Sequence, residues 1–301
     1  MDRCVGIVGV GNMGGALAAR LLAQGWQVRV CDLDGSRTAA LRAQGARVAA
    51  TPADAAQGCA ALIVCVVDAQ QTSEVLFGAH GAAPGCAAGL PVLLCPTIAP
   101  ESVEAIAARL ASAGAVAIDA PMSGGPQRAR DGAMSLMVAC ADEVFTRIEP
   151  LLGALSTQVF RISDQLGDGA RTKLVNNLLA GINLAGAAQA LALAQRLGLD
   201  LPTTLDVIER SSGQSWIGSD RMRRAIAGDL APRAHITLLE KDTRLALQLA
   251  AAAGFSAPLG TAAHEAFAGA AAAGLAESDD AALLHWMARS QGHARAPRIP
   301  R

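Results

Sequence analysis

Three glycines near the start of the chain, in the pattern G-x-G-x-x-G, constrain its fold more than any other feature. The apolar run Cys4–Val8 leads directly into this pattern, and a helix-like stretch follows it. Such a loop between a strand and a helix makes a tight turn and lets a dinucleotide pyrophosphate approach the helix N-terminus. The pattern predicts a dinucleotide site whose residues include Gly9, Gly11, Asn12, Met13 and Gly14.

A carboxylate stands where the same fingerprint requires one. Asp32 follows the second apolar run, Gln27–Cys31, and lies about 20 residues beyond the glycine loop. There it can accept hydrogen bonds from the ribose hydroxyls of the cofactor, and its charge repels a 2′-phosphate, so NAD is favoured over NADP. Arg37 lies close by in sequence and works against that preference. A second interpretation of Asp32 is a helix N-cap.

Short apolar runs alternate with helix-like stretches through the first half of the chain. This alternation is typical of βαβ units and a parallel sheet. The expected strands are Cys4–Val8, Gln27–Cys31, Ala61–Val67, Pro91–Cys95, Val116–Ala120, Ala133–Ala139 and Thr157–Arg161. The expected helices between them are Met13–Gln24, Arg37–Gln44, Glu101–Ala113 and Asp142–Leu152.

The pattern changes at a polar, glycine-containing stretch, Ser163–Gly169. Beyond it the strand-like runs stop, and the stretches Ala170–Leu197, Pro202–Arg210, Ile236–Ala253, Ala257–Ala273 and Ser278–Arg289 are helix-like. We therefore expect an α/β fold class in which a Rossmann-type parallel sheet domain is followed by an all-α helical domain. The expected boundaries are 1–163 for the NAD-binding domain, 164–290 for the helical substrate and oligomerisation domain, and 291–301 for a flexible tail.

Composition excludes several classes of protein. Hydrophobic residues make up 52% of the 301 residues and charged residues 17%, which is unlike a disordered chain. No long run of strongly apolar residues indicates a membrane span, and no cluster of Lys and Arg indicates a nucleic-acid surface. The first strand begins too early to leave room for a signal peptide. We expect a soluble, cytoplasmic protein without membrane or nucleic-acid partners.

Cysteine and histidine spacing gives no sign of a metal site. The seven cysteines all fall in the first half without C-x-x-C spacing, and the five histidines are scattered. An odd number of cysteines argues against a complete set of disulfides. We expect structural thiols and no bound metal.

Lysine is rare in this chain, which draws attention to the two that are present. Only Lys173 and Lys241 are lysines among the 25 lysine and arginine residues, and tyrosine is absent. Arginine stays protonated in proteins, whereas lysine can exchange a proton near neutral pH. Lys173 shares a helix face with Asn177, four residues on, so both side chains can converge on one ligand. The alternatives are a surface lysine and an asparagine that bridges neighbouring helices.

Two further stretches carry candidate site residues. If the fold brings Lys241 near Lys173, the like charge favours a neutral Lys173, as proton exchange requires. Asp242 is expected to hold either lysine in place, or else to form a surface ion pair. The sequence Ser123-Gly124-Gly125 follows an expected strand, and its backbone N–H groups suit a carboxylate, although a flexible turn explains it equally.

Together these stretches resemble the β-hydroxyacid dehydrogenase family, which includes 3-hydroxyisobutyrate dehydrogenase and tartronate semialdehyde reductase. The resemblance extends to about Met287 and implies a Rossmann domain, a helical domain and an active site between them. It implies that Lys173 is catalytic, that Asn177 assists, and that Lys241 lies beside cofactor and substrate. In the family pattern the substrate carboxylate is bound by Ser123, Gly124 and Gly125. The residues that match positions lining the dinucleotide are Val67, Asp68 and Thr97, where Asp68 departs from the usual proline.

Within the family, the chain resembles the L-threonate dehydrogenases. The stretches that carry this are Asp68–Gln71, Val75–Gly78, Gly213–Trp216 and Arg221-Met222. The resemblance implies a lid in which Trp216 shapes the pocket and Arg221 meets polar groups of a longer sugar acid. It implies NAD-dependent oxidation of L-threonate or a close relative.

Other functions stay open on the sequence alone. Oxidation of 3-hydroxyisobutyrate, or the tartronate semialdehyde reaction, would use the same residues. An imine reductase usually lacks the lysine, and a non-catalytic NAD-binding sensor needs neither the lysine nor a carboxylate site. The stretch Ala170–Leu197 is rich in Ala and Gly on several sides, which favours close helix packing and a homodimer or homotetramer.

Overall fold

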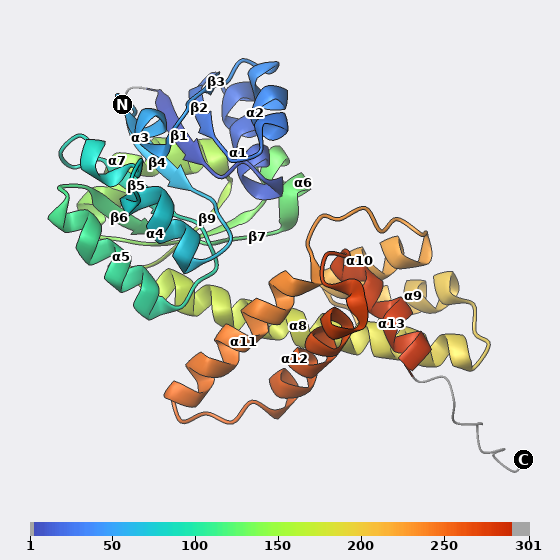
Figure 1. The fold of residues 1–301 in the computed structure, drawn as a ribbon. Coiled ribbons are helices and arrows are strands. Elements are labelled where there is room, and N and C mark those ends of the chain that lie inside the picture. The colour runs from blue at the N-terminus through green and yellow to red at the C-terminus, as the bar shows by residue number, and fades with distance from the viewer. Residues whose placement is uncertain (1–2, 291–301) are drawn as a thin grey trace, which may run out of the picture. The chain divides into compact units, whose positions relative to one another are not determined.

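The computed structural model describes residues 3–290. The chain divides into two compact units, Met1–Leu174 and Val175–Arg301, and the division falls inside one long helix. The first unit contains the sheet and the second is helical (Figure 1). The expected tail 291–301 lies outside the described residues.

A nine-stranded sheet forms the centre of the first unit, with strand order β3-β2-β1-β4-β5-β6-β8-β7 and β9 beside β8. The strands from β3 to β6 in this order run parallel, whereas β8 is antiparallel to β6. The strands are β1 (Cys4–Val8), β2 (Gln27–Cys31), β3 (Arg47–Val48), β4 (Ala61–Val64), β5 (Pro91–Leu94), β6 (Val116–Asp119), β7 (Met122–Ser123), β8 (Ser135–Ala139) and β9 (Gln158–Ser163). Because the order reverses at β1, the parallel part has the Rossmann arrangement, in which ligands bind at the carboxyl ends of the strands.

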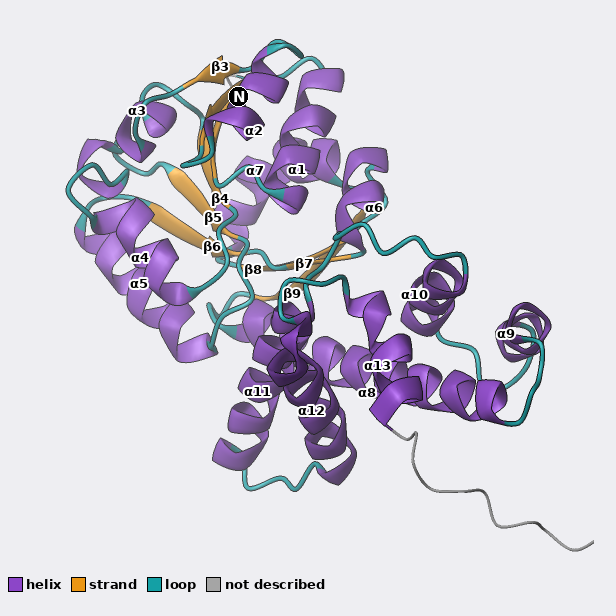
Figure 2. Ribbon diagram, turned by 45° about the vertical axis from the view of Figure 1, so that its right-hand side comes forward, coloured by secondary structure: helices purple, strands orange, loops and turns teal. Residues whose placement is uncertain are grey.

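Helices cover both faces of this sheet (Figure 2). Alternate residues of each strand point to opposite faces, so Ile7 and Ile63 pack with α1, α6 and α7. Leu62 and Leu94 pack with α3, α4 and α5 on the other face. The helices are α1 (Asn12–Ala23), α2 (Gly35–Arg42), α3 (Pro52–Ala56), α4 (Ala69–Phe77), η1 (Ala83–Gly85), α5 (Pro100–Ser112), α6 (Gly125–Asp131) and α7 (Asp142–Leu155).

The second unit is built from helices around one apolar core. Leu184, Leu191, Met222 and Phe267 are among its fully buried side chains. The helices are α8 (Asp168–Arg196), α9 (Leu201–Glu209), α10 (Trp216–Ile226), α11 (Ile236–Ala252), α12 (Pro258–Ala270), η2 (Ala271–Leu275), η3 (Asp280–Ala282) and α13 (Leu283–Ser290). The first turns of α8 belong to the first unit, because the division lies between Leu174 and Val175. The fold class expected from the sequence is confirmed.

Helix α8 is long and apolar enough, by length and composition only, to cross a membrane. The sequence analysis expected no such stretch, but the charged residues Arg171 and Lys173 stand at one end of the helix and leave an uncharged segment beyond them. One such helix is weak evidence for a membrane span, because core helices of soluble proteins have the same character. Leu184, Ala188 and Leu191 of α8 are fully buried within the protein.

Candidate functional site

The glycine loop after β1 has the backbone geometry that a dinucleotide needs. Gly9 has a φ of 84°, and a Cβ there would lie 2.7 Å from the Cys65 carbonyl oxygen. A Cβ on Gly14 would lie 1.9 Å from the Gly9 carbonyl oxygen, so α1 can approach the strand only if this residue is glycine. At Gly11, by contrast, the nearest atom to an added Cβ is Arg37 Nη1 at 3.5 Å. The loop is tightly packed at its two ends and open in the middle.

Helix α1 starts directly after this open position. Gly11 is its N-cap and makes no side-chain capping bond, and Asn12 and Met13 are its first residues. The first N–H groups of a helix have no partners within the helix, and the helix dipole favours an anion beside them. These residues fit the pyrophosphate of a nicotinamide dinucleotide.

The Asp32 carboxylate, directly after β2, binds the backbone of the glycine loop. Its Oδ2 accepts a hydrogen bond from Val10 N at 2.7 Å, and its Oδ1 accepts one from Asp34 N at 2.9 Å. The N-cap of α2 is Asp34, which accepts a hydrogen bond from Ser36 N, so the interpretation of Asp32 as a helix N-cap is wrong. Arg37 Nη1 lies 3.8 Å from Asp32 Oδ1. A cation therefore stands beside the carboxylate at the expected ribose site.

The other expected cofactor residues follow the carboxyl ends of the neighbouring strands. Val67 follows β4 and is half exposed, and its N–H donates to Gln71 Oε1 at 3.1 Å. Asp68 is the N-cap of α4 and accepts a hydrogen bond from Gln71 N at 2.8 Å. Thr97 follows β5. Because β1, β4 and β5 are parallel neighbours, these residues lie at the same edge of the sheet as the glycine loop.

The Ser123-Gly124-Gly125 turn is held in a defined conformation. Ser123 belongs to β7 and pairs with Ser135 of β8, and α6 starts at Gly125. Gly124 and Gly125 have φ values of 127° and 76°, which favour glycine. A Cβ on Gly125 would meet no atom within 4 Å. The turn therefore has space beside its backbone, as a bound carboxylate requires.

Helix α8 carries two buried polar side chains one turn apart. Lys173 and Asn177 are each only 7% exposed. Asn177 Nδ2 donates to Asp242 Oδ2 at 2.6 Å, and Asn177 Oδ1 accepts a hydrogen bond from Asn176 Nδ2 at 3.0 Å. These two contacts fix the plane of the Asn177 amide, which retains one N–H and one lone pair for a ligand.

Asp242 connects Asn177 with the second lysine. Lys241 Nζ lies 3.0 Å from Asp242 Oδ1, which is an ion-pair distance. Apart from this ion pair, Oδ1 has no partner among the described residues. Asp242 is buried, so the alternative of a surface ion pair is wrong. The buried Asp242 carboxylate therefore contacts both Asn177 and Lys241, which are candidate site residues.

The expected lid residues Trp216 and Arg221 lie on a helix. Ser215 caps α10 by accepting a hydrogen bond from Gly218 N at 3.1 Å. Trp216 is 45% exposed, whereas Arg221 is buried and its Nε donates to Asp280 Oδ1 at 2.7 Å. Burial raises the pKa of Asp280 to about 6, against the opposing effect of the Arg221 charge. The contact with Asp280 explains the buried position of the Arg221 side chain, so no ligand is needed to explain it.

The structure also shows that Asp119, to which the sequence analysis assigned no role, contacts the start of α8. This residue ends β6 and is 1% exposed. Its Oδ2 accepts hydrogen bonds from Gly167 N at 3.0 Å and Ala170 N at 2.9 Å, at the start of α8. Asp119 is the one charged residue in the strand-like run Val116–Ala120, and that is the signal by which it could have been found.

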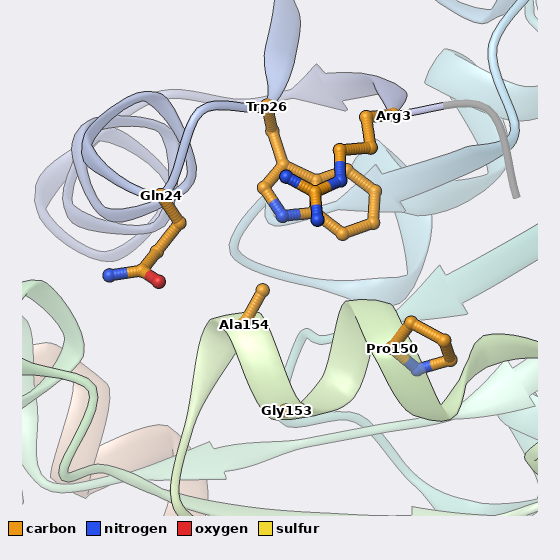
Figure 3. Close-up of a pocket in the computed structure, with 6 residues that line it drawn as sticks. All are labelled: Arg3, Gln24, Trp26, Pro150, Gly153 and Ala154. Carbon is orange, nitrogen blue, oxygen red and sulfur yellow. The ribbon is translucent and has the colours of Figure 1, made fainter.

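Two cavities of the first unit lie at the opposite edge of the sheet. One of about 420 Å³ is lined by Arg3, Gln24, Trp26, Pro150, Gly153 and Ala154 (Figure 3). Another, of about 400 Å³, is lined by residues that include Cys59, Ala60 and Arg147. Arg3, Trp26 and Ala60 precede the amino ends of β1, β2 and β4, whereas the cofactor residues follow the carboxyl ends. Neither cavity belongs to the candidate site.

No metal centre is apparent in residues 3–290, where no group of three or more His, Cys, Asp or Glu side chains could hold a metal ion. Five of the seven cysteines are buried and none forms a disulfide. Burial raises the pKa of Cys65, beneath the glycine loop, to about 12. This thiol is therefore protonated at neutral pH and suits a structural role.

Two glycine substitutions separate packing from cofactor binding. Gly14→Ala should destabilise the protein by about 1–3 kcal/mol, because the new methyl group overlaps the Gly9 carbonyl. Gly11→Ala should leave the unfolding free energy nearly unchanged and weaken cofactor binding at least about tenfold, because its methyl group occupies the open side of the loop. Urea unfolding and calorimetric titration with NAD measure the two effects. Tight NAD binding by Gly11→Ala would contradict the assignment of this loop.

Comparison with known proteins agrees with this geometry. Residues 4–163 match the model of the NAD binding domain of 6-phosphogluconate dehydrogenase. Residues 167–287 match the model described as the NAD-binding domain of NADP-dependent 3-hydroxyisobutyrate dehydrogenase.

Individual relatives extend over nearly the whole chain. An L-threonate dehydrogenase of Cupriavidus necator is 37% identical over 94% of this chain and 96% of its own length. The crystal structure of 3-hydroxyisobutyrate dehydrogenase from Salmonella typhimurium is 37% identical, has a TM-score of 0.90, and covers 95% of this chain and 100% of that one. Psf3, solved with NADP+ and 2-OPP, is 29% identical with a TM-score of 0.88 over 94% of this chain and 99% of that chain. The chain therefore belongs to the β-hydroxyacid dehydrogenase family and is an oxidoreductase with a nicotinamide cofactor.

Proposed function

We propose that this enzyme oxidises L-threonate or a closely related hydroxy acid with NAD, and that Lys173 is its general acid/base. The observation that carries the proposal is the pair of buried polar side chains, Lys173 and Asn177, one turn apart on α8. The chain has only one other lysine, Lys241, which adjoins the Asp242 carboxylate that holds Asn177. The family's L-threonate dehydrogenases support the choice of substrate.

Each polar group has a defined task in this reaction. NAD held by the glycine loop and Asp32 would supply the hydride acceptor for oxidation of the alcohol to a carbonyl. Lys173 takes the hydroxyl proton, and general base catalysis of this kind is worth ~10²–10⁴-fold. The fixed Asn177 amide orients the same hydroxyl, and the Ser123-Gly124-Gly125 turn binds the carboxylate through its N–H groups.

The buried Asp242 Oδ1 favours a substrate with more than one hydroxyl. Lys241 Nζ lies 3.0 Å from this atom, which has no other partner among the described residues, and a carboxylate oxygen can accept from a second donor. A further hydroxyl of a polyhydroxy acid can donate to it, whereas 3-hydroxyisobutyrate has only one hydroxyl for Lys173 and Asn177. Because one related crystal structure is that of a 3-hydroxyisobutyrate dehydrogenase, 3-hydroxyisobutyrate is the second candidate substrate.

Substitution of Lys173 tests the chemistry. Lys173→Ala should lower kcat at least ~10²-fold, because the proton acceptor is lost, while NAD binding stays within about twofold. Lys173→Arg is the matched control, since it keeps the charge but cannot exchange a proton, and it should be equally inactive. Stopped-flow formation of NADH and calorimetric titration with NAD provide the two measurements. Normal turnover by either variant would refute the role of Lys173.

A panel of acids tests the substrate. Purified enzyme and NAD are mixed with L-threonate, 3-hydroxyisobutyrate, glycerate and L-serine, and NADH is followed. The highest kcat/KM is expected with L-threonate. Preference for 3-hydroxyisobutyrate would retain the mechanism and replace the substrate, whereas NAD binding without turnover of any acid would favour a non-catalytic sensor.

The preference for NAD depends on Asp32. Its carboxylate would lie beside the 2′-phosphate of NADP, while Arg37 opposes this repulsion at a distance of 3.8 Å. Asp32→Asn keeps an acceptor for Val10 N and removes the charge, so the ratio of kcat/KM for NAD over NADP should fall about tenfold or more. Arg37→Ala should change the ratio in the opposite direction. An unchanged ratio in Asp32→Asn would mean that another residue selects the cofactor.

An apolar stripe on α8 supports association with a second copy of the chain. Val175, Leu179 and Leu193 are exposed, and Leu193 follows Val175 by about five helical turns, so they share one face. Gly186 lies between them, and a Cβ there would meet no atom within 4 Å. A two-fold axis would bring this face against the same face of a second copy, and we infer a homodimer or homotetramer that uses it.

Light scattering after gel filtration tests this association. The wild type should run at a multiple of its monomer mass, and Leu179→Glu with Leu193→Glu should reduce the mass, because two charges would be buried in the contact. Leu33→Glu, at an exposed position of the first unit, is the matched control and should leave the mass unchanged. A wild type that runs as a monomer would refute the inference.

A further inference from the structure

The start of α8 is built around one buried carboxylate. Asp119 Oδ2 accepts hydrogen bonds from the backbone N–H groups of Gly167 and Ala170, which flank the first turn of the helix. The amino end of a helix favours an anion, so these bonds combine hydrogen-bonding geometry with the helix dipole. Asp119 itself is the last residue of β6, so its backbone is fixed by the sheet.

Gly169 shows how closely the helix approaches this carboxylate. A Cβ at this position would lie 2.8 Å from Asp119 Cγ, and 2.9 and 3.0 Å from the two carboxylate oxygens. No side chain fits there without displacing the carboxylate. The first turn of α8 therefore packs directly on the Asp119 side chain.

The remaining contacts of this turn are more exposed. Arg171 pairs with Glu104 at 2.8 Å and with Asp168 at 3.0 Å, and all three side chains are about one third exposed or more. Exposed ion pairs of this kind contribute little to stability. Asp119 is therefore the buried polar anchor of the turn.

We propose that Asp119 is a positioning residue that holds the first turn of α8, and with it Lys173, against the carboxyl end of β6. Lys173 follows Ala170 by nearly one helical turn, and Ser123 follows Asp119 by one short extended segment. A single carboxylate thus fixes both the segment that carries the general base and the segment that leads to the carboxylate-binding turn. This inference rests on the proposed role of Lys173.

The electrostatics of Asp119 are consistent with such an anchor. Burial raises the pKa of its carboxyl to about 6, the N–H groups of Ala170, Gly167 and Gly169 lower it, and Asp168 raises it. Burial raises the pKa of the Cys95 thiol, and the charge of Asp119 raises it further. The anchor is ionised, and its hydrogen bonds are strongest, above a pH of about 6. As the pH falls below that value the carboxyl is protonated and its hold on the helix weakens.

Two pairs of variants test the proposal. Asp119→Asn removes the charge at nearly constant shape, and Asp168→Asn is its control, because it removes a charge from the same turn without touching the buried N–H groups. Gly169→Ala leaves Asp119 in place but displaces its carboxylate. Gly153→Ala is the matched glycine control, since Gly153 lies in α7, where a Cβ would meet no atom within 4 Å.

Asp119→Asn and Gly169→Ala should each lower kcat about 10- to 100-fold with NAD affinity nearly unchanged, because a displaced base loses its alignment. The wild-type kcat profile should contain a component near pH 6 that Asp119→Asn lacks. Asp168→Asn and Gly153→Ala should retain wild-type kcat. Equal kcat in Asp119→Asn and Asp168→Asn, or an unchanged pH profile in Asp119→Asn, would overturn the positioning role.

Hydrogen exchange separates this inference from the proposed reaction. Amides of the first turn of α8 should exchange faster in Asp119→Asn than in the wild type or in Asp168→Asn. This measurement needs no substrate, so it decides whether Asp119 anchors the turn even if no acid in the panel is oxidised. Unchanged exchange would refute the anchor, whereas faster exchange in an enzyme inactive on every acid would refute only the proposed substrate reaction.

Discussion

Helix α1 can lie against the end of β1 only because residue 14 has no side chain. An added Cβ would overlap the Gly9 carbonyl at 1.9 Å, and the rest of the first unit depends on this close approach. The approach lets Leu17 and Leu21 fill the core on one face of the sheet. It also presents the start of the helix at the edge where the cofactor residues gather. Asp32 then closes the loop through Val10 N.

Polar contacts, together with apolar packing, hold the part of α8 that carries Lys173 and Asn177. The first turn of α8 is bound by Asp119 of β6, and the next turns by Asp242 of α11 through Asn177. Both carboxylates are buried, so each is costly to leave without partners. Hydrogen bonds are directional, whereas apolar contacts tolerate sliding, so these contacts define the positions of the two turns more closely.

The sequence predicted the longer elements well, because apolar runs and helical periodicity are local signals. Strands β1 and β2 agree at both ends, whereas β3 and β7 have two residues each and show no periodicity. Helix α10 was missed because the polar, serine- and glycine-containing stretch that precedes it resembles a loop. Lys173 and Asn177 were singled out by rarity and spacing, and both prove to be buried. The Asn177–Asp242 and Arg221–Asp280 contacts join residues far apart in the chain, and no local pattern encodes them.

The scarcity of lysine has a consequence for the chemical handling of this protein. Lys173 is buried and Lys241 is nearly so, and they are the only side-chain amines in the chain. Reagents that acylate or reductively methylate amines usually modify many surface lysines at once. On this protein, by contrast, the positively charged side chains of the surface are arginines rather than lysines. Apart from the amino terminus, any amine label that attaches therefore reports on one of two residues at the candidate site, and its rate measures how often that residue is exposed to solvent.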